Sequence, residues 1–400
     1  MTKADVYGEV KTWKKPIHAS RTFLAKSYLK LLPNIKIIGI TGSVGKTLTQ
    51  NAIVSVLSQK YKVVAADENL DPTFRIPKTI LSAKPWHKFM ILEYGVEHPG
   101  EMDHYLKIVI PDIAVVTAIA PTHLKYFNDV DGVYKEKVKL VKALPRGGYA
   151  ILNTDDPKVV KMASLTRTKV WFYGEKTKNG IKISHFSQNL KGSKFRLHYQ
   201  GQKASVNWRV IGRHQLTSAY AAATIGIIES LTLKQIANGL SNIKVPDHRL
   251  TPITTSNVNI IDDTYNASPK AADEALKTLL EVGRGKKKVA VFGEMKDLGR
   301  YSHKAHQVLG EKIAKSNVSL LLTVGKVTQL IARYAKKNHF RGKIVSVFSA
   351  SDAIRELKKI TNAKAIILIK GSRHAHLERI VLGLLGSSTE INCYHCGKLS

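Results

Sequence analysis

The 400-residue sequence predicts an α/β fold with two domains, each a parallel sheet flanked by helices, and an antiparallel extension between them. Three observations carry this prediction. A β-branched run at residues 35–40 leads into a glycine-bearing turn and then into helical spacing. Short β-like runs fill residues 169–210. Strand and helix patterns then alternate over residues 257–385, which is typical of a doubly wound parallel sheet.

The first strand and its turn read IKIIGITGSVGKTLTQN. Gly42 and Gly45 allow the backbone to wrap closely around phosphate oxygens, Lys46 adds a positive charge, and Thr47 offers a hydroxyl to Mg²⁺. The order of strand, loop and helix is what a phosphate-binding loop requires, so the predicted ligand is a nucleoside triphosphate with magnesium. The spacing departs from the commonest form, GxxxxGK[ST], because Ile40 stands where that form has its first glycine.

Four segments follow from these patterns. Residues 1–34 form a basic N-terminal segment, and residues 35–246 form a P-loop parallel-sheet ATPase domain with its antiparallel extension. Residues 247–387 form a Rossmann-like C-terminal domain, and residues 388–400 form a tail. The sequence VPDHR around the junction after residue 246 has the composition of a domain boundary.

The formal net charge is +33, from 63 basic and 30 acidic residues, and the excess is spread along the whole chain. Such a field attracts anions of any kind. No aromatic RNA-binding motif or DNA-reading helix pattern accompanies it, so we expect no specific nucleic-acid partner. The sequence holds no apolar run long enough to span a bilayer and no signal peptide, so we expect a cytoplasmic protein that acts as a monomer.

Both ends of the sequence carry weaker patterns. Residues 20–32 have roughly helical apolar spacing interrupted by lysines, which predicts a basic amphipathic helix. Packing on the ATPase core is the favoured role for this helix, and weak docking on an anionic membrane surface is the alternative. Cys393 and Cys396 form one CxxC, which is half a zinc site at most, so a reduced, solvated tail is favoured.

Polar residues follow two further strands of the first domain. Glu93 ends the run FMIL, and His123 comes soon after the run that ends at Ala118. Ligands bind at the carboxyl edge of open parallel sheets, so Glu93 is a candidate metal ligand and His123 a candidate catalytic or metal-binding residue. The helical run at residues 131–144 carries lysines at positions that composition alone assigns to a solvated face.

Several stretches, in this order, resemble the Mur ligase family from Ile35 to about Leu385. In that family ATP phosphorylates a substrate carboxylate, an amine attacks the acyl phosphate, and an amide forms. The resemblance implies addition of D-alanyl-D-alanine to a UDP-muramyl peptide in peptidoglycan precursor synthesis. The alternatives are a Mur-type ligase with another envelope or polyglutamate-like acceptor, and a basic P-loop binding protein without ligation. The matching stretches are ITGSVGKT, EYGVEHPGEM, PDIAVVTAIAPTHLKYF, the helix with KEK, YAILNTDD, IIDDTYNASP, VAVFGEMKDLG and LIKGSR.

The resemblance also implies roles for individual residues. Lys46, His123 and Lys137 are the implied catalytic residues, and Lys137 matches the lysine that the family carbamylates, which turns a cation into a metal-binding anion. Thr47 and Glu93 are implied to hold one Mg²⁺, with His123 and carbamylated Lys137 contributing to the metal site. The implied ATP contacts are Gly42, Ser43, Gly45, Lys46, Thr47, Gln215, Arg249, Asp263, Tyr265 and Asn266.

The sequence departs from the family pattern in three places. Only about thirty-five residues precede the loop, so the resemblance does not include the family's uridine-binding N-terminal domain. The HNxxN pattern near the adenine reads HQLTS here, so Gln215 and Ser218 replace its asparagines. Residues 67–77 have the composition of a polar loop, and a helix is expected over residues 78–83. Within that loop, residues 69–75, NLDPTFR, stand where the family has an asparagine-rich loop with a glycine that helps to hold the acceptor. We therefore expect intact ATP machinery and an altered acceptor side.

Overall fold

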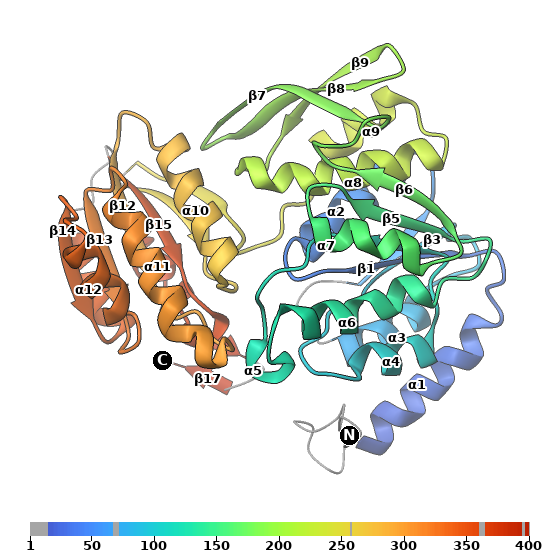
Figure 1. The fold of residues 1–400 in the computed structure, drawn as a ribbon, viewed down its shortest axis with the longest axis horizontal. Helices are drawn as coiled ribbons and strands as arrows, with labels where there is room; N and C mark the ends of the chain where they lie inside the picture. Colours follow the sequence, from blue (N-terminus) through green and yellow to red (C-terminus); the bar gives the residue numbers. More distant parts are fainter. Residues whose placement is uncertain (1–14, 67–71, 257, 360–364, 394–396, 400) are drawn as a thin grey trace. The chain divides into compact units, whose positions relative to one another are not determined.

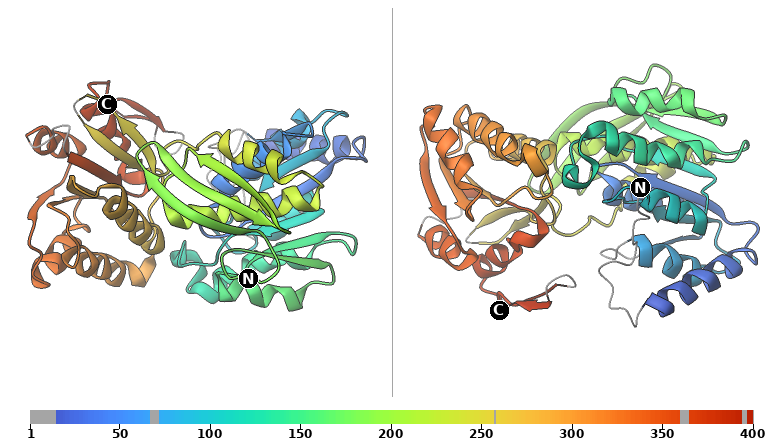
Figure 2. Two further views of the ribbon diagram at one scale, coloured as in Figure 1. Left: turned by 90° about the horizontal axis from the view of Figure 1, so that it is seen from above. Right: turned by 60° about the horizontal axis from the view of Figure 1, so that its bottom comes forward.

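The computed structural model describes residues 15–66, 72–256, 258–359, 365–393 and 397–399, and the chain divides into two compact units. The first unit comprises residues 1–186, 194–209 and 215–246, and the second comprises residues 187–193, 210–214 and 247–400. Figures 1 and 2 show the element order along the chain.

The first unit is built on a six-stranded parallel sheet in the order β2-β3-β1-β4-β5-β6. Helices cover both faces, with α2 and α8 on one and α3, α4 and α6 on the other (Figure 1). The strands are β1 (Lys36–Thr41), β2 (Val63–Ala65), β3 (Phe89–Glu93), β4 (Ile113–Val116), β5 (Tyr149–Asn153) and β6 (Lys169–Tyr173). The helices are α1 (Lys15–Leu29), α2 (Lys46–Leu57), α3 (Pro72–Ser82), α4 (Glu101–Ile108), α5 (Leu124–Phe127), α6 (Val130–Lys142), α7 (Pro157–Val160), α8 (Leu216–Ile228) and α9 (Leu233–Ser241), with 3₁₀ turns η2 (Lys161–Leu165) and η3 (Arg213–Gln215).

Strand β1 lies between β3 and β4, and Ile38, Gly39 and Ile40 pair with both neighbours. The isoleucine side chains of this strand are buried, as the β-branched run predicts. The chain leaves β1 toward one side of the sheet and later returns to its other side, so the loop after β1 sits at the topological switch point. Open α/β sheets bind their ligands at this position.

Two local predictions for the first unit are wrong. The run KVWFY belongs to the main sheet as β6, parallel to β5, and not to the antiparallel extension. That extension is the three-stranded sheet β7 (Lys182–Asn189), β8 (Gly192–Tyr199) and β9 (Gln202–Trp208), whose two-residue connections require antiparallel neighbours (Figure 2). Helix α3 begins at Pro72 rather than near residue 78, because proline is well suited to the first turn of a helix.

The second unit has a six-stranded sheet in the order β10-β11-β15-β12-β13-β14. The five strands from β11 to β14 in this order are parallel, as predicted, but the edge strand β10 pairs antiparallel with β11. The strands are β10 (Thr251–Thr254), β11 (Asn259–Asp263), β12 (Lys287–Phe292), β13 (Leu320–Val324), β14 (Lys343–Val347) and β15 (Ala365–Lys370). The helices are α10 (Pro269–Val282), α11 (Ser302–Ala314), α12 (Gln329–Lys337), α13 (Ala350–Lys358) and α14 (Glu378–Leu384), with 3₁₀ turns η4 (Gly299–Tyr301) and η5 (Arg373–Ala375).

Both the basic N-terminal segment and the C-terminal tail contain regular secondary structure. Helix α1 packs on α3, where the Tyr28 hydroxyl donates to the Ala83 carbonyl at 2.8 Å and the His18 ring lies 4.3 Å from that of Phe74. Strands β16 (Ile391–Cys393) and β17 (Gly397–Leu399) form an antiparallel hairpin, and Cys396 lies outside the described residues. No helix within the described residues is both long and apolar enough to cross a bilayer.

We expect Gly239→Ala to lower the free energy of unfolding by about 1–3 kcal/mol. A Cβ at Gly239 would lie 2.6 Å from the Cα of Val56 and 2.8 Å from the Ser55 carbonyl oxygen, so α9 could no longer approach α2 so closely. Gly147→Ala is the matched control, because nothing lies within 4 Å of its added Cβ. Urea unfolding of the two variants measures the difference, and equal stabilities would show that α2 and α9 adjust freely.

Candidate active site

The loop after β1 has the backbone geometry of an anion-binding turn. Gly42 and Gly45 both have positive φ, +147° and +81°. A Cβ on Gly42 would lie 1.9 Å from the Thr117 hydroxyl oxygen, so only glycine fits there, whereas Gly45 faces open space. Helix α2 starts directly after Gly45, so its first N–H groups and the loop amides surround the same space.

Hydroxyl groups attach this loop to the end of β4. Thr117 Oγ1 donates to the Val44 carbonyl at 2.6 Å. Ser43 N donates to the Ala118 carbonyl at 2.7 Å, and Ser43 Oγ donates to the Ala120 carbonyl at 3.0 Å. The Ser43 side chain therefore holds the loop against the segment after β4, and its predicted contact with ATP stays a prediction.

The two functional side chains of the loop are placed by the start of α2. Lys46 Nζ donates to the Gly42 carbonyl at 3.0 Å, so the ammonium group folds back over the loop. Thr47 is buried in the first turn. A Cβ at Gly95 would lie 3.4 Å from both Lys46 Cε and Pro72 Cγ, so the lysine stem and the start of α3 meet beside the end of β3.

Glu93, the last residue of β3, is 4% exposed and ion-paired with Arg75 of α3. Arg75 Nη2 donates to Glu93 Oε2 at 2.9 Å, and Arg75 is itself 6% exposed. A carboxylate buried at this depth requires a cation or several donors. The predicted metal ligand therefore already has a positive partner, which the sequence did not indicate.

Lys137 is 2% exposed on α6, so it does not belong to a solvated face. Burial lowers the pKa of its amine well below the ordinary value, and the positive charge of Lys46 lowers it further, while Glu101, Glu136 and Glu97 act in the opposite direction. The influence of Lys46 places this amine near the phosphate-binding loop. The lowered pKa favours the neutral, nucleophilic form of this amine.

The carboxylates around Lys137 are held by the start of α4. Glu136 Oε1 accepts from the N–H groups of Gly100 and Met102 at 3.0 and 2.9 Å. Glu101 Oε2 accepts from the N–H of Glu97 at 2.7 Å, and burial raises the pKa of this carboxyl despite that hydrogen bond. The bonds of Glu136 hold α6 against the start of α4, so the part of α6 that carries Lys137 is fixed in place.

His123 begins α5 with a left-handed backbone, φ 52°, just beyond β4. Its Nε2 lies 4.0 Å from Glu97 Oε1, and its side chain is 19% exposed. Gln215 lies half-buried at the start of α8, one turn before Ser218, whose hydroxyl bonds Thr49 of α2 at 2.9 Å. The structure thus brings Lys46, Thr47, Glu93, His123 and Lys137 to the same edge of one sheet and places Gln215 beside the P-loop helix.

The donors at this edge suit Mg²⁺ by their chemistry. Hydroxyl and carboxylate oxygens from Thr47 and Glu93 are the hard ligands that Mg²⁺ prefers, and the Arg75 guanidinium shows that Glu93 takes a cation. No cluster of three or more His, Cys, Asp or Glu side chains capable of holding a metal occurs among the described residues.

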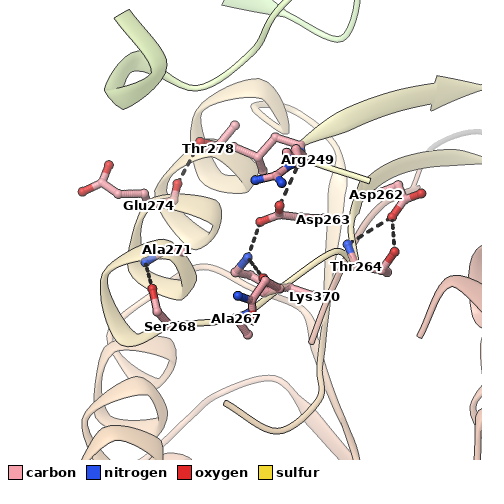
Figure 3. Close-up of polar contacts among 12 residues, drawn as sticks. Arg249, Asp262, Asp263, Thr264, Ala267, Ser268, Ala271, Glu274, Thr278 and Lys370 are labelled. Carbon is pink, nitrogen blue, oxygen red and sulfur yellow. Dashed lines mark hydrogen bonds and ion pairs between the residues drawn. The ribbon is translucent and has the colours of Figure 1, made fainter. Parts of the chain in front are cut away.

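The second unit has its own polar edge, centred on Asp263 at the end of β11 (Figure 3). Lys370 Nζ, at the end of β15, donates to Asp263 Oδ2 at 2.6 Å and to the Asn266 carbonyl at 2.8 Å. Asp263 Oδ1 accepts from Leu250 N at 3.2 Å. Burial raises the pKa of Asp263, and the Lys370 charge opposes that rise.

Tyr265 lies between two guanidinium groups. Arg249 Cζ is 3.9 Å and Arg373 Cζ 5.2 Å from the centre of its ring. His248 Nδ1 lies 2.7 Å from Asp262 Oδ2, and this carboxylate raises the pKa of the imidazole. The four predicted nucleotide contacts of this unit, at residues 249, 263, 265 and 266, therefore share one edge.

Arg75, Thr117, Lys370 and Arg373 are the functional-site residues that had no prediction. Arg75 lies on α3 and Thr117 directly follows β4, and neither has a local pattern that marks it for a site, so only the fold brings them to the loop. Lys370 and Arg373 lie in the stretch LIKGSR, which contributed to the family resemblance, so that stretch was the available signal.

We expect Lys46→Ala to reduce nucleotide turnover by at least about 10²-fold without unfolding the chain, because it removes the positive charge that faces the phosphate from a half-buried side chain. ATP hydrolysis and circular dichroism check the two halves of this prediction. Lys135→Ala, an exposed lysine on α6, is the control. Unchanged turnover in the Lys46 variant would refute the phosphate-loop assignment.

Comparisons with known proteins agree with this geometry. Residues 40–226 match the Mur ligase middle domain, and residues 248–373 match the Mur ligase, glutamate ligase domain. The UDP-N-acetylmuramoyl-tripeptide--D-alanyl-D-alanine ligase of Bacillus subtilis is 31% identical over 91% of this chain and 79% of its own length. The enzyme of that name from Escherichia coli is 30% identical over 88% of this chain and 78% of its own length.

Solved structures give the same result for the fold. MurF from Acinetobacter baumannii superposes with a TM-score of 0.84 at 25% identity, over 92% of this chain and 81% of that one. MurF ligase from Thermotoga maritima, solved in complex with ADP, has a TM-score of 0.80 at 23% identity, over 91% and 82% of the two chains. The predicted fold class is confirmed, and the chain belongs to the Mur ligase family.

Proposed function

We propose that this protein is an ATP-dependent ligase that forms an amide between the carboxylate of a UDP-muramyl peptide and D-alanyl-D-alanine, as a cytoplasmic monomer. The observation that carries the proposal is the buried Lys137 amine at the same sheet edge as the phosphate loop and Glu93. A protein that merely bound nucleotide would have no need to bury a lysine there. Relatives that carry the name of this activity support the choice of substrates.

The chain's own residues suit phosphoryl transfer to a carboxylate. The loop amides and Lys46 hold the transferred phosphate and neutralise charge that develops on it. A carboxylate oxygen of the substrate attacks the γ-phosphorus, and ADP leaves. The amine then attacks the carbonyl carbon, the C–O bond to phosphate breaks, and inorganic phosphate leaves as the amide forms.

The metal residues in this proposal are Thr47, Glu93, His123 and a carbamylated Lys137. Bound Mg²⁺ supplies Lewis-acid stabilisation of phosphate charge. Carbon dioxide adds only to a neutral amine, and a buried Lys137 with a lowered pKa meets that requirement. The new bond joins Lys137 Nζ to the carbon of carbon dioxide, and the nitrogen loses a proton. The product is a carbamate anion, which replaces the lysine cation that would otherwise face the metal.

Phosphate release from the purified protein tests the function. UDP-muramyl tripeptide is crossed with D-alanyl-D-alanine, with single amino acids and with no amine. We expect release only when carboxylate and dipeptide are both present. Release with single amino acids instead would identify a Mur-type ligase with another acceptor specificity, and ATP binding without release in any combination would identify a nucleotide-binding protein.

Lys137→Ala should be nearly inactive yet folded, with partial recovery when a short carboxylate is added to the buffer. Lys135→Ala should keep full activity, because Lys135 is exposed on the same helix. Initial rates with and without added carboxylate measure this. Equal activity of the two variants would remove the carbamylation proposal.

We further propose a weak association of helix α1 with anionic lipid. Ile17 and Leu24 lie seven residues apart, so they share one stripe of α1, and they are 49% and 57% exposed. Leu31, just beyond the end of the helix, is 72% exposed. Phe23, about 100° away around the helix, is 70% exposed. No acidic residue occurs between Glu9 and Asp67. An exposed apolar stripe in a purely basic segment complements a negatively charged bilayer surface.

Vesicle sedimentation tests this surface. The wild type should bind vesicles of phosphatidylcholine with phosphatidylglycerol, bind less at high salt, and not bind phosphatidylcholine alone. The double variant Phe23→Ser, Leu24→Ser should lose the binding, while Phe348→Ser, an equally exposed phenylalanine of the second unit, should retain it. Unchanged vesicle binding by the double variant would show that another surface of the protein, and not α1, contacts the lipid.

A further inference from the structure

The ion pair between Arg75 and Glu93 lies where the proposed function requires a metal. Glu93 ends β3 at the carboxyl edge of the sheet, and Arg75 Nη2 donates to its Oε2 at 2.9 Å. Both side chains are more than nine-tenths buried. The carboxylate expected to bind Mg²⁺ is therefore already neutralised by a side chain of the same unit.

Arg75 is held in this position by α3. Pro72 starts the helix next to Lys46, and Arg75 lies one turn further on. The Thr79 hydroxyl donates to the Arg75 carbonyl at 2.8 Å, which fixes the backbone across Pro77, a residue without an N–H to give. The guanidinium is thus part of a folded helix beside the phosphate loop.

The pairing does not use all the capacity of the guanidinium. Its Nε is buried and has no hydrogen-bond partner among the residues that the structure describes. A buried donor without an acceptor is costly, and arginine presents five donors in a fixed fork. The guanidinium can therefore donate one more hydrogen bond, for example to an oxygen of a bound ligand.

We propose that Arg75 is a built-in counter-cation for Glu93 that competes with the divalent ion for this carboxylate and so sets the magnesium requirement of the site. The inference rests on the proposed function in one respect, the assignment of Glu93 as a metal ligand. Two cations on one carboxylate repel each other, so the guanidinium weakens divalent binding while it stabilises the metal-free protein. Metal binding in turn weakens the ion pair between Glu93 and Arg75 of α3.

Binding of Mn²⁺ in the presence of ADP tests this, with free Mn²⁺ followed by electron paramagnetic resonance. Arg75→Gln keeps donors but removes the charge, and it should bind Mn²⁺ at a several-fold lower concentration than the wild type. Arg75→Lys keeps the charge and should need nearly as much Mn²⁺ as the wild type. In a Glu93→Gln background the Arg75→Gln change should no longer alter Mn²⁺ binding.

Thermal unfolding supplies the second readout. In EDTA, Arg75→Gln should melt below the wild type, and Mn²⁺ with ADP should narrow that gap. Lys36→Met is the matched control, since it removes the Lys36–Glu229 pair (2.8 Å) at the opposite end of β1, and metal should not narrow its deficit.

An unchanged or increased Mn²⁺ requirement in Arg75→Gln would overturn the proposal, as would a melting deficit that metal leaves unchanged. Both outcomes would make Arg75 a purely structural residue or a support for the metal site. These readouts need no ligation. If the variants bind Mn²⁺ as expected here but the protein releases no phosphate in the ligation assay, the proposed function is rejected and this inference stands.

Discussion

The cost of burying a charge governs how the polar residues of this protein are arranged. Glu93 is buried at the end of β3, and its carboxylate pairs with the Arg75 guanidinium at 2.9 Å. Lys137 is buried on α6, and burial lowers its pKa. Asp263 is buried in the second unit against the Lys370 ammonium at 2.6 Å.

The two sheets supply the places where such charges are tolerated. The carboxyl ends of parallel strands meet at one edge, where loops and helix starts offer N–H groups to anions. In the first unit this edge holds the phosphate loop, attached to β4 by the Thr117 hydroxyl. In the second it holds Asp263 and the Tyr265 ring between two arginines. Each unit therefore brings its own polar edge to the chemistry.

Much of this arrangement could be predicted from sequence. Strong local signals, such as the isoleucine run, the glycines at 42 and 45 and the alternation after residue 257, correctly predicted the sheets and the glycine turn between β1 and α2. Lys137 could be singled out only through the family resemblance, because a lysine among other lysines on a helix carries no local sign that it is buried. The Arg75 ion pair could not be predicted, since it joins a helix to a strand end eighteen residues away in a segment that composition described as a loop.

The membership of KVWFY in the main sheet shows another limit. Short β-like runs look alike in sequence whether they pair in parallel after a helical crossover or antiparallel through a hairpin. Here the helical turns before Lys169 return the chain beside β5, whereas two-residue connections create the hairpins of β7 to β9. Connection length and not strand composition decides between the two arrangements.

Activation of a substrate carboxylate by ATP is tested most directly by the transfer of a labelled oxygen. UDP-muramyl tripeptide labelled with ¹⁸O in its terminal carboxylate is turned over with ATP and D-alanyl-D-alanine, and the released phosphate is analysed by mass spectrometry. An acyl phosphate intermediate predicts that each phosphate released during amide formation carries one labelled oxygen. Amide formation with unlabelled phosphate would contradict the mechanism.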